Sequence, residues 1–333
     1  MITKVFVGEK MKLVVMIPAY NEEKSLGGVI AEIPPGIEGI SEIEILVIDD
    51  GSTDGTVKEA EKAGADKVIS HSGNMGLGVT FKDGLDMALD MGADIMVNID
   101  ADGQYNAYEI PVLVRPIVEQ KADIVLGWRN INALDFMPRG KKLGNKLATW
   151  ATRISAGFPV KDAQSGYRAF SRDAALKMNL SGKYTYVQET LMQAKYKGLW
   201  VEQVPIEFRA RRGESRLISG IFNYALKAGR TILSTLRDYR PLWLFCSIGG
   251  LITAAGLGFA AGVLNHYLRT GFVSPHIPSA IAASLLIIVG LGVMVFGVIA
   301  DLFKKQRLLE EEILYQLKKS STGSDISKDV SVS

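Results

Sequence analysis

Two long stretches without a single charged residue lie in the last third of this 333-residue chain. They run from Leu242 to Leu264 and from Pro278 to Ala300. A helix needs about 20 apolar residues to cross a bilayer, so each stretch is long enough to span one. Two buried core helices of a soluble domain are the alternative, but uncharged runs of this length are hard to place in a core. The sequence therefore predicts a transmembrane hairpin over residues 241–303.

Glycine is frequent in both apolar stretches, and small residues let membrane helices approach closely. The short connection between the stretches carries one strong cation, Arg269. More basic residues flank the hairpin on its outer sides: Arg230, Arg237, Arg240, Lys304, Lys305 and Arg307. Because basic flanks stay on the cytoplasmic side, we expect an integral membrane protein with both termini and the N-terminal domain in the cytoplasm.

The chain before about Arg240 alternates between apolar strands and helical patterns. Expected strands are Lys12–Ile17, Glu44–Ile48, Lys67–Ser70, Ile95–Ile99 and Ile124–Gly127. Expected helices are Glu22–Ile33, 53–62, Leu77–Asp90 and Glu109–Glu119. Continuous apolar strands separated by helices predict an α/β domain whose mainly parallel sheet is covered on both faces. In such sheets the ligand binds beyond the carboxyl ends of the strands.

Composition excludes several classes of site. The net charge of +2 gives no indication of nucleic-acid binding. The single cysteine, Cys246, excludes an internal disulfide framework and a cysteine-based zinc site. The presence of only three histidines, His71, His266 and His276, argues against a multi-histidine metal site.

Carboxylates follow the strand expected at Ile95–Ile99. Asp100 and Asp102 are separated by one residue, and Gln104 adds an amide oxygen. Mg²⁺ and Mn²⁺ prefer oxygen ligands and complete their shells with water and substrate phosphates. A turn with solvated acids has the same composition, so the spacing alone leaves both readings open.

Two more polar segments follow expected strands. Asp49 and Asp50 begin a segment in which one acid could bind a base or ribose, while Ser52 or Thr53 could cap the next helix. The segment that opens with Pro18 contains Tyr20, which could border a nucleobase, although Asn21 could simply start a helix there. We expect Pro18 to end the first strand.

The motifs PAYNEE, VIDDGSTDGT, GNMGLG and NIDADGQ, in this order, resemble family 2 glycosyltransferases with the GT-A fold. The most similar subgroup is the polyprenyl-phosphate sugar synthases, which include dolichol-phosphate mannose synthase. The resemblance implies a mixed, mainly parallel sheet between helices, followed by amphipathic interface helices and two transmembrane helices. It also implies that nucleobase and ribose are surrounded by Pro18, Tyr20, Glu22 and Asp49, with Asp50, Asp100 and Ala101 also near the nucleotide. Asp102 and Gln104 would hold Mg²⁺ or Mn²⁺ on the diphosphate.

Later segments of the chain are similar to the acceptor side of that family. Asp162–Arg168 resembles an acceptor segment with a Ser165–Gly166 pair. The arginines Arg211, Arg212 and Arg216 lie in a stretch that resembles a loop closing over the donor diphosphate, and either of the first two could make that contact. Arg129 and Arg139 fall where the family binds the acceptor phosphate. The resemblance therefore implies catalytic roles for Asp102, Arg129, Arg139 and Arg212, although any single arginine could be a solvated surface charge.

The expected organisation has five parts. An extension covers residues 1–11, a catalytic domain 12–217, amphipathic interface helices 218–240, the hairpin 241–303, and a helix with a disordered tail 304–333. The interface helices could instead be an ordinary surface helix of the domain. The sequence sets no oligomeric state, and a homo-oligomer through the membrane helices is compatible with the resemblance.

The predicted reaction is inverting transfer of a sugar from a nucleotide-diphosphate sugar, of the GDP-mannose or UDP-glucose type, to dolichyl or polyprenyl phosphate. A phosphate acceptor is already anionic and needs no strong base, which fits a site rich in arginine. One alternative is a hydroxyl acceptor on a glycolipid or polysaccharide, for which Glu189 would be the candidate base. A nucleotide-binding module without catalysis is another. A Rossmann dehydrogenase is disfavoured, because Gly73, Gly76 and Gly78 lack the required spacing.

Overall fold

The computed structural model describes residues 11–180, 186–210, 233, 237 and 240–329. The chain forms two compact units, of which the first comprises Met1–Ala228 with Ile313–Ser333 and the second Gly229–Glu312. The amphipathic segment expected at 218–240 lies almost entirely outside the described residues. Each unit is described by itself below.

The first unit is built on a 7-stranded sheet with the order β3-β2-β1-β4-β6-β5-β7. The strands are β1 (Met11–Ala19), β2 (Ile40–Asp49), β3 (Lys67–Ser70), β4 (Ile95–Asn98), β5 (Ile124–Arg129), β6 (Arg168–Ser171) and β7 (Val201–Ile206). All neighbouring pairs are parallel except those of β6, which is antiparallel to both β4 and β5. The expected mixed, mainly parallel sheet is confirmed.

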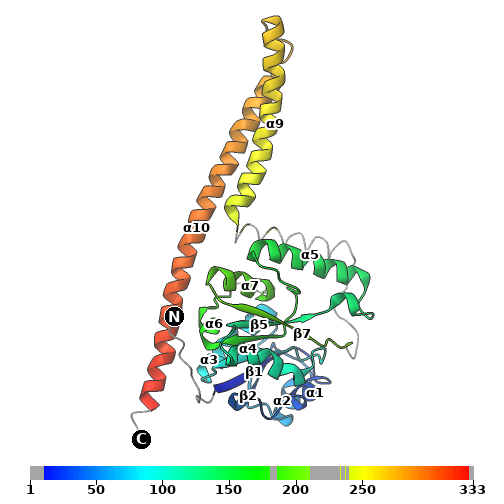
Figure 1. The fold of residues 1–333 in the computed structure, drawn as a ribbon, viewed down its shortest axis with the longest axis vertical. Helices are drawn as coiled ribbons and strands as arrows, with labels where there is room; N and C mark the ends of the chain where they lie inside the picture. The colour runs from blue at the N-terminus through cyan, green and yellow to red at the C-terminus, as the bar shows by residue number, and fades with distance from the viewer. Residues whose placement is uncertain (1–10, 181–185, 211–232, 234–236, 238–239, 330–333) are drawn as a thin grey trace. The chain divides into compact units, whose positions relative to one another are not determined.

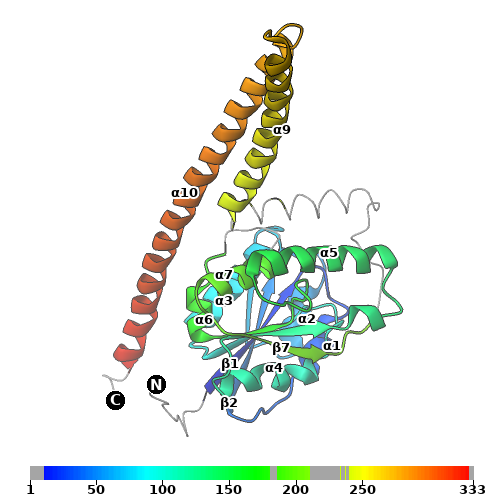
Figure 2. The same ribbon diagram turned by 45° about the horizontal axis from the view of Figure 1, so that its top comes forward.

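Helices cover both faces of this sheet (Figures 1 and 2). They are α1 (Leu26–Ala31), α2 (Thr56–Lys62), α3 (Leu77–Asp90), α4 (Ile110–Val118), α5 (Arg139–Ala156), α6 (Arg172–Lys177) and α7 (Tyr186–Tyr196), with short 3₁₀ turns η1 (Ala107–Glu109) and η2 (Ile131–Ala133). The bounds expected for β3 and α3 are confirmed. Helices α1 and α2 begin later than expected, because the residues before them form the loops of the site described below.

Strand β1 shows why the apolar strands are buried on both faces. Successive side chains of a strand point to opposite faces. Leu13, Val15 and Ile17 belong to the core beneath α1, α2 and α4, whereas Val14 and Met16 belong to the core beneath α3, α6 and α7. The strand continues through Pro18 to Ala19, so the expectation that Pro18 ends it was wrong. Pro18 pairs in register with Ile48 of β2.

The second unit contains two antiparallel helices, α9 (Pro241–Thr270) and the apolar part of α10 (Ile277–Asp329), which lie side by side in Figures 1 and 2. Both are long and apolar enough to cross a membrane. Only 11% and 17% of their most apolar windows are buried inside the chain, which is unlike the core helices of a soluble domain. The two candidate membrane helices expected from sequence are therefore present.

Glycine determines how closely α9 and α10 approach. A Cβ added at Gly249 would lie 2.5 Å from the carbonyl oxygen of Gly290, and one at Gly290 would lie 2.7 Å from that of Gly249. Further along the pair, a Cβ at Gly256 would lie 3.0 Å from the oxygen of Ala283. The close approach of backbones predicted from small residues is confirmed. Helix α10 continues to Asp329, so the helix expected at the start of 304–333 extends over most of that range.

Candidate active site

Three neighbouring strands end at the same edge of the sheet. Ala19 at the end of β1 is in register with Asp49 at the end of β2, and Met16 of β1 is in register with Asn98 of β4. Antiparallel β6 begins at this edge, since Arg168 pairs with Asn98. The topology thus brings together the PAYNEE, DDGST and DADGQ segments and the end of the Asp162–Arg168 segment.

The residues after β4 form the acidic part of the site. Asp102 accepts a hydrogen bond at Oδ1 from the backbone N–H of Gln104, at 3.1 Å. The side-chain amide nitrogen of Gln104 donates to the carbonyl oxygen of Arg209, at 3.2 Å. The oxygen of the same amide, Oε1, is therefore the atom of Gln104 that can act as an acceptor or ligand. Ala101, which separates the two acids in the sequence, is buried, with 2% of its surface exposed.

Gly166 is required where it lies beside Asp100. A Cβ at this position would lie 2.9 Å from the hydroxyl oxygen of Tyr186 and 3.1 Å from Oδ1 of Asp100. The Ser165–Gly166 pair therefore contacts the acidic strand end rather than solvent. Ser165 is fully buried, and its hydroxyl lies 3.5 Å from that of Tyr105.

The loops after β1 and β2 are joined by hydrogen bonds. The N–H of Asn21 donates to Oγ of Ser52 at 2.8 Å, and Oδ1 of Asn21 accepts from the N–H of Thr53 at 2.8 Å. The N–H of Glu22 donates to Oγ1 of Thr56 at 2.9 Å. Asn21 has a positive φ of 54°, which asparagine tolerates better than most residues.

These contacts correct the expected helix cap. Helix α2 has Gly55 as its N-cap with no side-chain hydrogen bond, so neither Ser52 nor Thr53 caps it. Helix α1 begins after Ser25, so Asn21 does not start it. Around these loops, Pro18 is buried, whereas Tyr20 is 39% exposed and could border a flat ligand. A carboxylate oxygen of Glu22 accepts from the hydroxyl of Ser25 at 2.8 Å.

The adjacent acids Asp49 and Asp50 point to different partners. The carboxylate of Asp49 accepts from the N–H of Ser52 at 3.1 Å. The carboxylate of Asp50 accepts from the N–H groups of Met75 and Gly76, at 2.8 and 3.0 Å, and contacts the ring of His71. Asp50 thus holds the loop before α3. Asp49 is the acid that faces the loops that follow β1 and β2.

Arg129 at the end of β5 is fixed by a buried carboxylate. Its Nε donates to Oδ2 of Asp162 at 2.6 Å and its Nη2 donates to Oδ1 at 3.1 Å, while its guanidinium lies 4.8 Å from the ring centre of Phe208. Burial alone would lower the pKa of Arg129, but Tyr105, Asp162 and Asp100 raise it further than burial lowers it. The guanidinium therefore stays charged, and its two hydrogen bonds to Asp162 hold it in one orientation.

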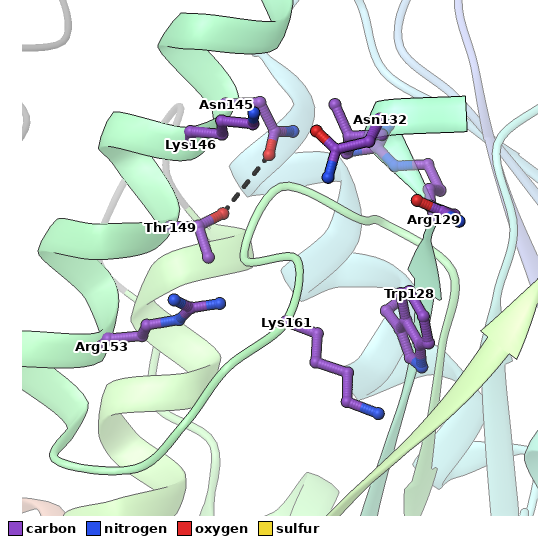
Figure 3. A pocket seen from close by; sticks show the side chains of 10 residues that line it. Trp128, Arg129, Asn132, Asn145, Lys146, Thr149, Arg153 and Lys161 are labelled. Carbon is purple, nitrogen blue, oxygen red and sulfur yellow. Dashed lines mark hydrogen bonds between the residues drawn. The ribbon is translucent and has the colours of Figure 1, made fainter. Parts of the chain in front are cut away.

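A pocket of about 370 Å³ opens beside Arg129 (Figure 3). Besides Arg129 of β5, its basic side chains come from α5 and from the segment before Asp162. Lining residues are Trp128, Arg129, Asn130, Ile131, Asn132, Asn145, Lys146, Thr149, Arg153 and Lys161. The Nζ of Lys161 lies 4.6 Å from the ring centre of Trp128, and the buried indole N–H has no hydrogen-bond partner among the described residues. A pocket that combines these cations with an unpaired indole N–H donor favours an anionic ligand.

Two further buried residues shape the site and were missed from sequence. The hydroxyl of Tyr105 accepts from the N–H of Gly166 at 3.1 Å, and burial raises the pKa of Tyr105 to about 12, with Arg129 lowering it and Asp100 raising it. Arg168 donates to the carbonyl oxygens of Ser165 and Ala163, at 2.9 and 3.3 Å, and contacts Thr190. Burial lowers the pKa of Arg168 to about 10. The sequence signal for Arg168 was its place at the end of the Asp162–Arg168 segment, which gave it no role of its own.

The remaining residues predicted from sequence either lie away from the pocket beside Arg129 or lie outside the described residues. Arg139 is the exposed first residue of α5 and does not line the pocket beside Arg129. Arg211, Arg212 and Arg216 lie outside the described residues. Glu189 is buried on α7, 3.4 Å from the side-chain nitrogen of Gln193.

The oxygen ligands at the end of β4 fit a hard divalent cation. Among the described residues, no three His, Cys, Asp or Glu side chains form a metal-sized cluster. Mg²⁺ and Mn²⁺ do not need one, because water and substrate phosphates complete their coordination. A carboxylate of Asp102 and the amide oxygen of Gln104 are of the right chemical type for such an ion.

The fold and this edge of acids and loops define an α/β domain of the GT-A type. The sequence profile of glycosyl transferase family 2 matches residues 14–178. A UDP-N-acetylglucosamine–dolichyl-phosphate N-acetylglucosaminyltransferase of Methanococcus voltae is 35% identical over 237 residues, which is 63% of this chain and 93% of that protein. An undecaprenyl-phosphate mannosyltransferase of Micrococcus luteus is 30% identical over 65% of this chain and 91% of its own length.

A solved structure has the same fold. Glucosyl-3-phosphoglycerate synthase from Mycobacterium tuberculosis, in complex with Mn²⁺, UDP-glucose and phosphoglyceric acid, matches with a TM-score of 0.53 and 25% identity. The match covers 68% of this chain and 78% of that one. The chain belongs to glycosyl transferase family 2.

Proposed function

We propose that this protein transfers a hexose or N-acetylhexosamine from a nucleotide-diphosphate sugar to a polyprenyl phosphate, with inversion at the anomeric carbon. The observation that carries the proposal is the proximity of two chemistries at one sheet edge. Tyr105 links the two: its hydroxyl accepts from Gly166, where an added Cβ would lie 3.1 Å from Oδ1 of Asp100. Its ring centre lies 5.2 Å from that of Phe208, which in turn lies 4.8 Å from the guanidinium of Arg129. The named relatives use dolichyl or undecaprenyl phosphate as acceptor, which supports the lipid class.

On the donor side, we assign the nucleoside to the loops after β1 and β2. Pro18, Tyr20, Glu22 and Asp49 would surround base and ribose, while Asp50 would act through the loop that it holds. Asp100 and Ala101 would lie along the nucleotide. Asp102 and Gln104 would hold Mg²⁺ or Mn²⁺, and that ion would offset negative charge on the diphosphate. The structural relative with Mn²⁺ and UDP-glucose supports this choice of metal.

On the acceptor side, Arg129 and the basic pocket would bind the lipid phosphate. A phosphate oxygen attacks the anomeric carbon, the bond from that carbon to the diphosphate oxygen breaks, and the nucleoside diphosphate leaves. The acceptor is already anionic, so no base has to remove a proton. Charge that accumulates on the leaving diphosphate would be stabilised by the arginines proposed for it: Arg211, Arg212 and Arg216. Arg139 stays a proposed second contact to the acceptor.

The apolar hairpin would hold the enzyme at the membrane that contains its acceptor. We propose that α9 and the apolar part of α10 span the bilayer with both chain ends in the cytoplasm, because the basic flanks lie outside the hairpin. The division into catalytic domain 12–217, interface segment 218–240, hairpin 241–303 and tail 304–333 is part of this proposal.

The decisive experiment is a substrate screen with the purified full-length protein. It combines a polyprenyl phosphate, Mg²⁺ or Mn²⁺ and a panel of UDP- and GDP-sugars, with the lipid product identified by mass spectrometry and its anomeric configuration by NMR. We expect one donor to be used in a metal-dependent reaction. The variant Asp102→Asn should lower kcat/KM by about 100-fold or more, as loss of a charge-stabilising group does, whereas Asp90→Asn on the exposed end of α3 should not.

Three outcomes would contradict the proposal. They are no lipid product with any donor, a product with retained configuration, and transfer only to a hydroxyl acceptor. In the last case Glu189→Gln should also cause a large loss of rate.

A further inference from the structure

We propose that His71 is a positioning residue for the nucleotide sugar: it holds the Asp50 carboxylate, and through it the loop 73–76, in the geometry that the donor site requires. The inference rests on the proposed function, because it assigns a role at the donor side of the same site. It concerns a residue that neither motif spacing nor family resemblance singled out.

His71 bridges two carboxylates from different elements. It directly follows β3, and its ring Nδ1 lies 3.0 Å from Oδ1 of Asp50 while its Nε2 lies 3.2 Å from Oδ2 of Asp83 on α3. The His71 side chain is only 15% exposed. Asp83 also faces a cation, since Nζ of Lys82 lies 3.8 Å from its Oδ1.

Asp50, one end of the bridge, also bonds the loop before α3. Asp50 uses Oδ1 for both the ring of His71 and the N–H of Met75, and Oδ2 for the N–H of Gly76. The turn at Gly51 and the loop are in backbone contact, since a Cβ at Gly51 would lie 2.5 Å from Cα of Gly73. A shift of the Asp50 carboxylate would therefore move both segments.

The same contacts reach the acid proposed to bind the nucleoside. The N–H of His71 donates to the carbonyl oxygen of Asp49 at 2.9 Å. The N–H of Asp50, the residue after Asp49, donates to the carbonyl oxygen of Ala19 at 2.8 Å. This bond ties β2 to β1 at the strand ends. His71 thus supports Asp49 through its backbone and Asp50 through its ring.

The number of N–H donors on residue 71 separates the useful substitutions. A neutral imidazole has one ring N–H, whereas an imidazolium or a guanidinium can donate to both carboxylates. Phenylalanine keeps a ring of similar size but donates to neither. The variant His71→Arg should therefore preserve the bridge, and His71→Phe should remove it.

The test measures kcat and both KM values in full-length variants. We expect His71→Phe to raise the donor KM by about tenfold, the size expected when charge-assisted hydrogen bonds are lost. The acceptor KM should not change, and His71→Arg should restore the donor KM to within about threefold. Asp83→Asn should raise the donor KM in the same direction by a smaller factor, and Ser72→Ala, the exposed neighbour, should have no effect.

A purely structural role makes a different prediction. It would lower kcat in proportion to the folded fraction, measured by thermal unfolding, and leave both KM values unchanged. That result, or a donor KM that stays the same in both His71→Phe and Asp83→Asn, would overturn the proposal.

Binding of UDP and GDP in the presence of Mn²⁺, measured by calorimetry, provides a readout without turnover. If the wild type binds a nucleotide and His71→Phe binds it about tenfold more weakly, the positioning role stands even where no lipid product forms. Equal nucleotide binding by the two proteins would overturn it. Failure of the substrate screen is thereby separated from failure of this inference.

Discussion

At the scale of single residues, Arg129 is oriented before any ligand binds. Its two hydrogen bonds to Asp162 form a fork in which the carboxylate is fully buried. Asp162 also accepts from the side chain of Asn145 at 3.3 Å and from the N–H of Gln164 at 3.1 Å. A guanidinium held in this way can present its remaining N–H groups to a phosphate without losing much entropy.

Replacement of Arg129 by lysine should raise the acceptor KM by about tenfold, because an ammonium group cannot make the fork to Asp162 and contact a phosphate at the same time. Asp162→Asn should act in the same direction, and the donor KM should be unaffected in both variants. Arg115→Lys, on the exposed surface of α4, is the matched control. Steady-state kinetics with varied acceptor would reveal the effect, and an increase confined to the donor KM would contradict this assignment.

At the scale of elements, the hairpin depends on backbone contact between α9 and α10. Gly249 and Gly290 leave no space for a side chain between the helices, whereas Gly258 and Gly262 of α9 have no atom within 4 Å of an added Cβ. Glycines of the same helix α9 therefore lie in different environments: Gly249 is needed for packing, whereas Gly258 and Gly262 are not.

Gly249→Leu should destabilise the hairpin by about 1–3 kcal/mol, since the new side chain would overlap the α10 backbone. Gly258→Leu adds the same volume to an open face and should be nearly neutral. Thermal unfolding of the detergent-solubilised protein measures the difference between the two variants. Equal stability of both would mean that the helices do not approach at Gly249.

At the scale of the whole molecule, residues from the end of the chain complete the first unit. The hydroxyl of Tyr315 donates to Asp173 of α6 at 2.8 Å, and Nζ of Lys318 donates to Asp86 of α3 at 2.7 Å. Burial acts to raise the pKa of Asp86 and of Asp173. Hydrogen bonds from Lys318 and Lys82 at Asp86, and from Lys177 and Tyr315 at Asp173, lower both pKa values below the ordinary one.

The double variant Tyr315→Phe/Lys318→Met should lose about 1–2 kcal/mol of stability at pH 7. Because the folded pKa values of both acids are lowered, their contribution is fully present above the unfolded pKa of about 4 and is lost as pH falls through the folded value. The difference between wild type and variant should therefore shrink below pH 4. Denaturant unfolding at pH 7, 5 and 3 tests this, and a pH-independent difference would exclude the two carboxylates as its source.

The sequence determined what depends on local pattern. Apolar periodicity located β3 and α3 at their observed bounds, and the order of motifs indicated the fold and the acidic strand ends. The uncharged lengths and glycines of the last third indicated two closely packed helices, because bilayer thickness and close packing constrain composition directly.

Tertiary structure decided which partner each polar group finds. Asp49 and Asp50 are identical neighbours in sequence, yet the carboxylate of Asp49 bonds Ser52 in the loop after β2, whereas that of Asp50 accepts from the backbone of the 73–76 loop and contacts His71. Ser52 and Thr53 bond to Asn21 instead of capping a helix, and Arg129 finds Asp162 from 33 positions away. A hydrogen bond depends on distance and direction in space, and those are set only when distant strands and loops fold together.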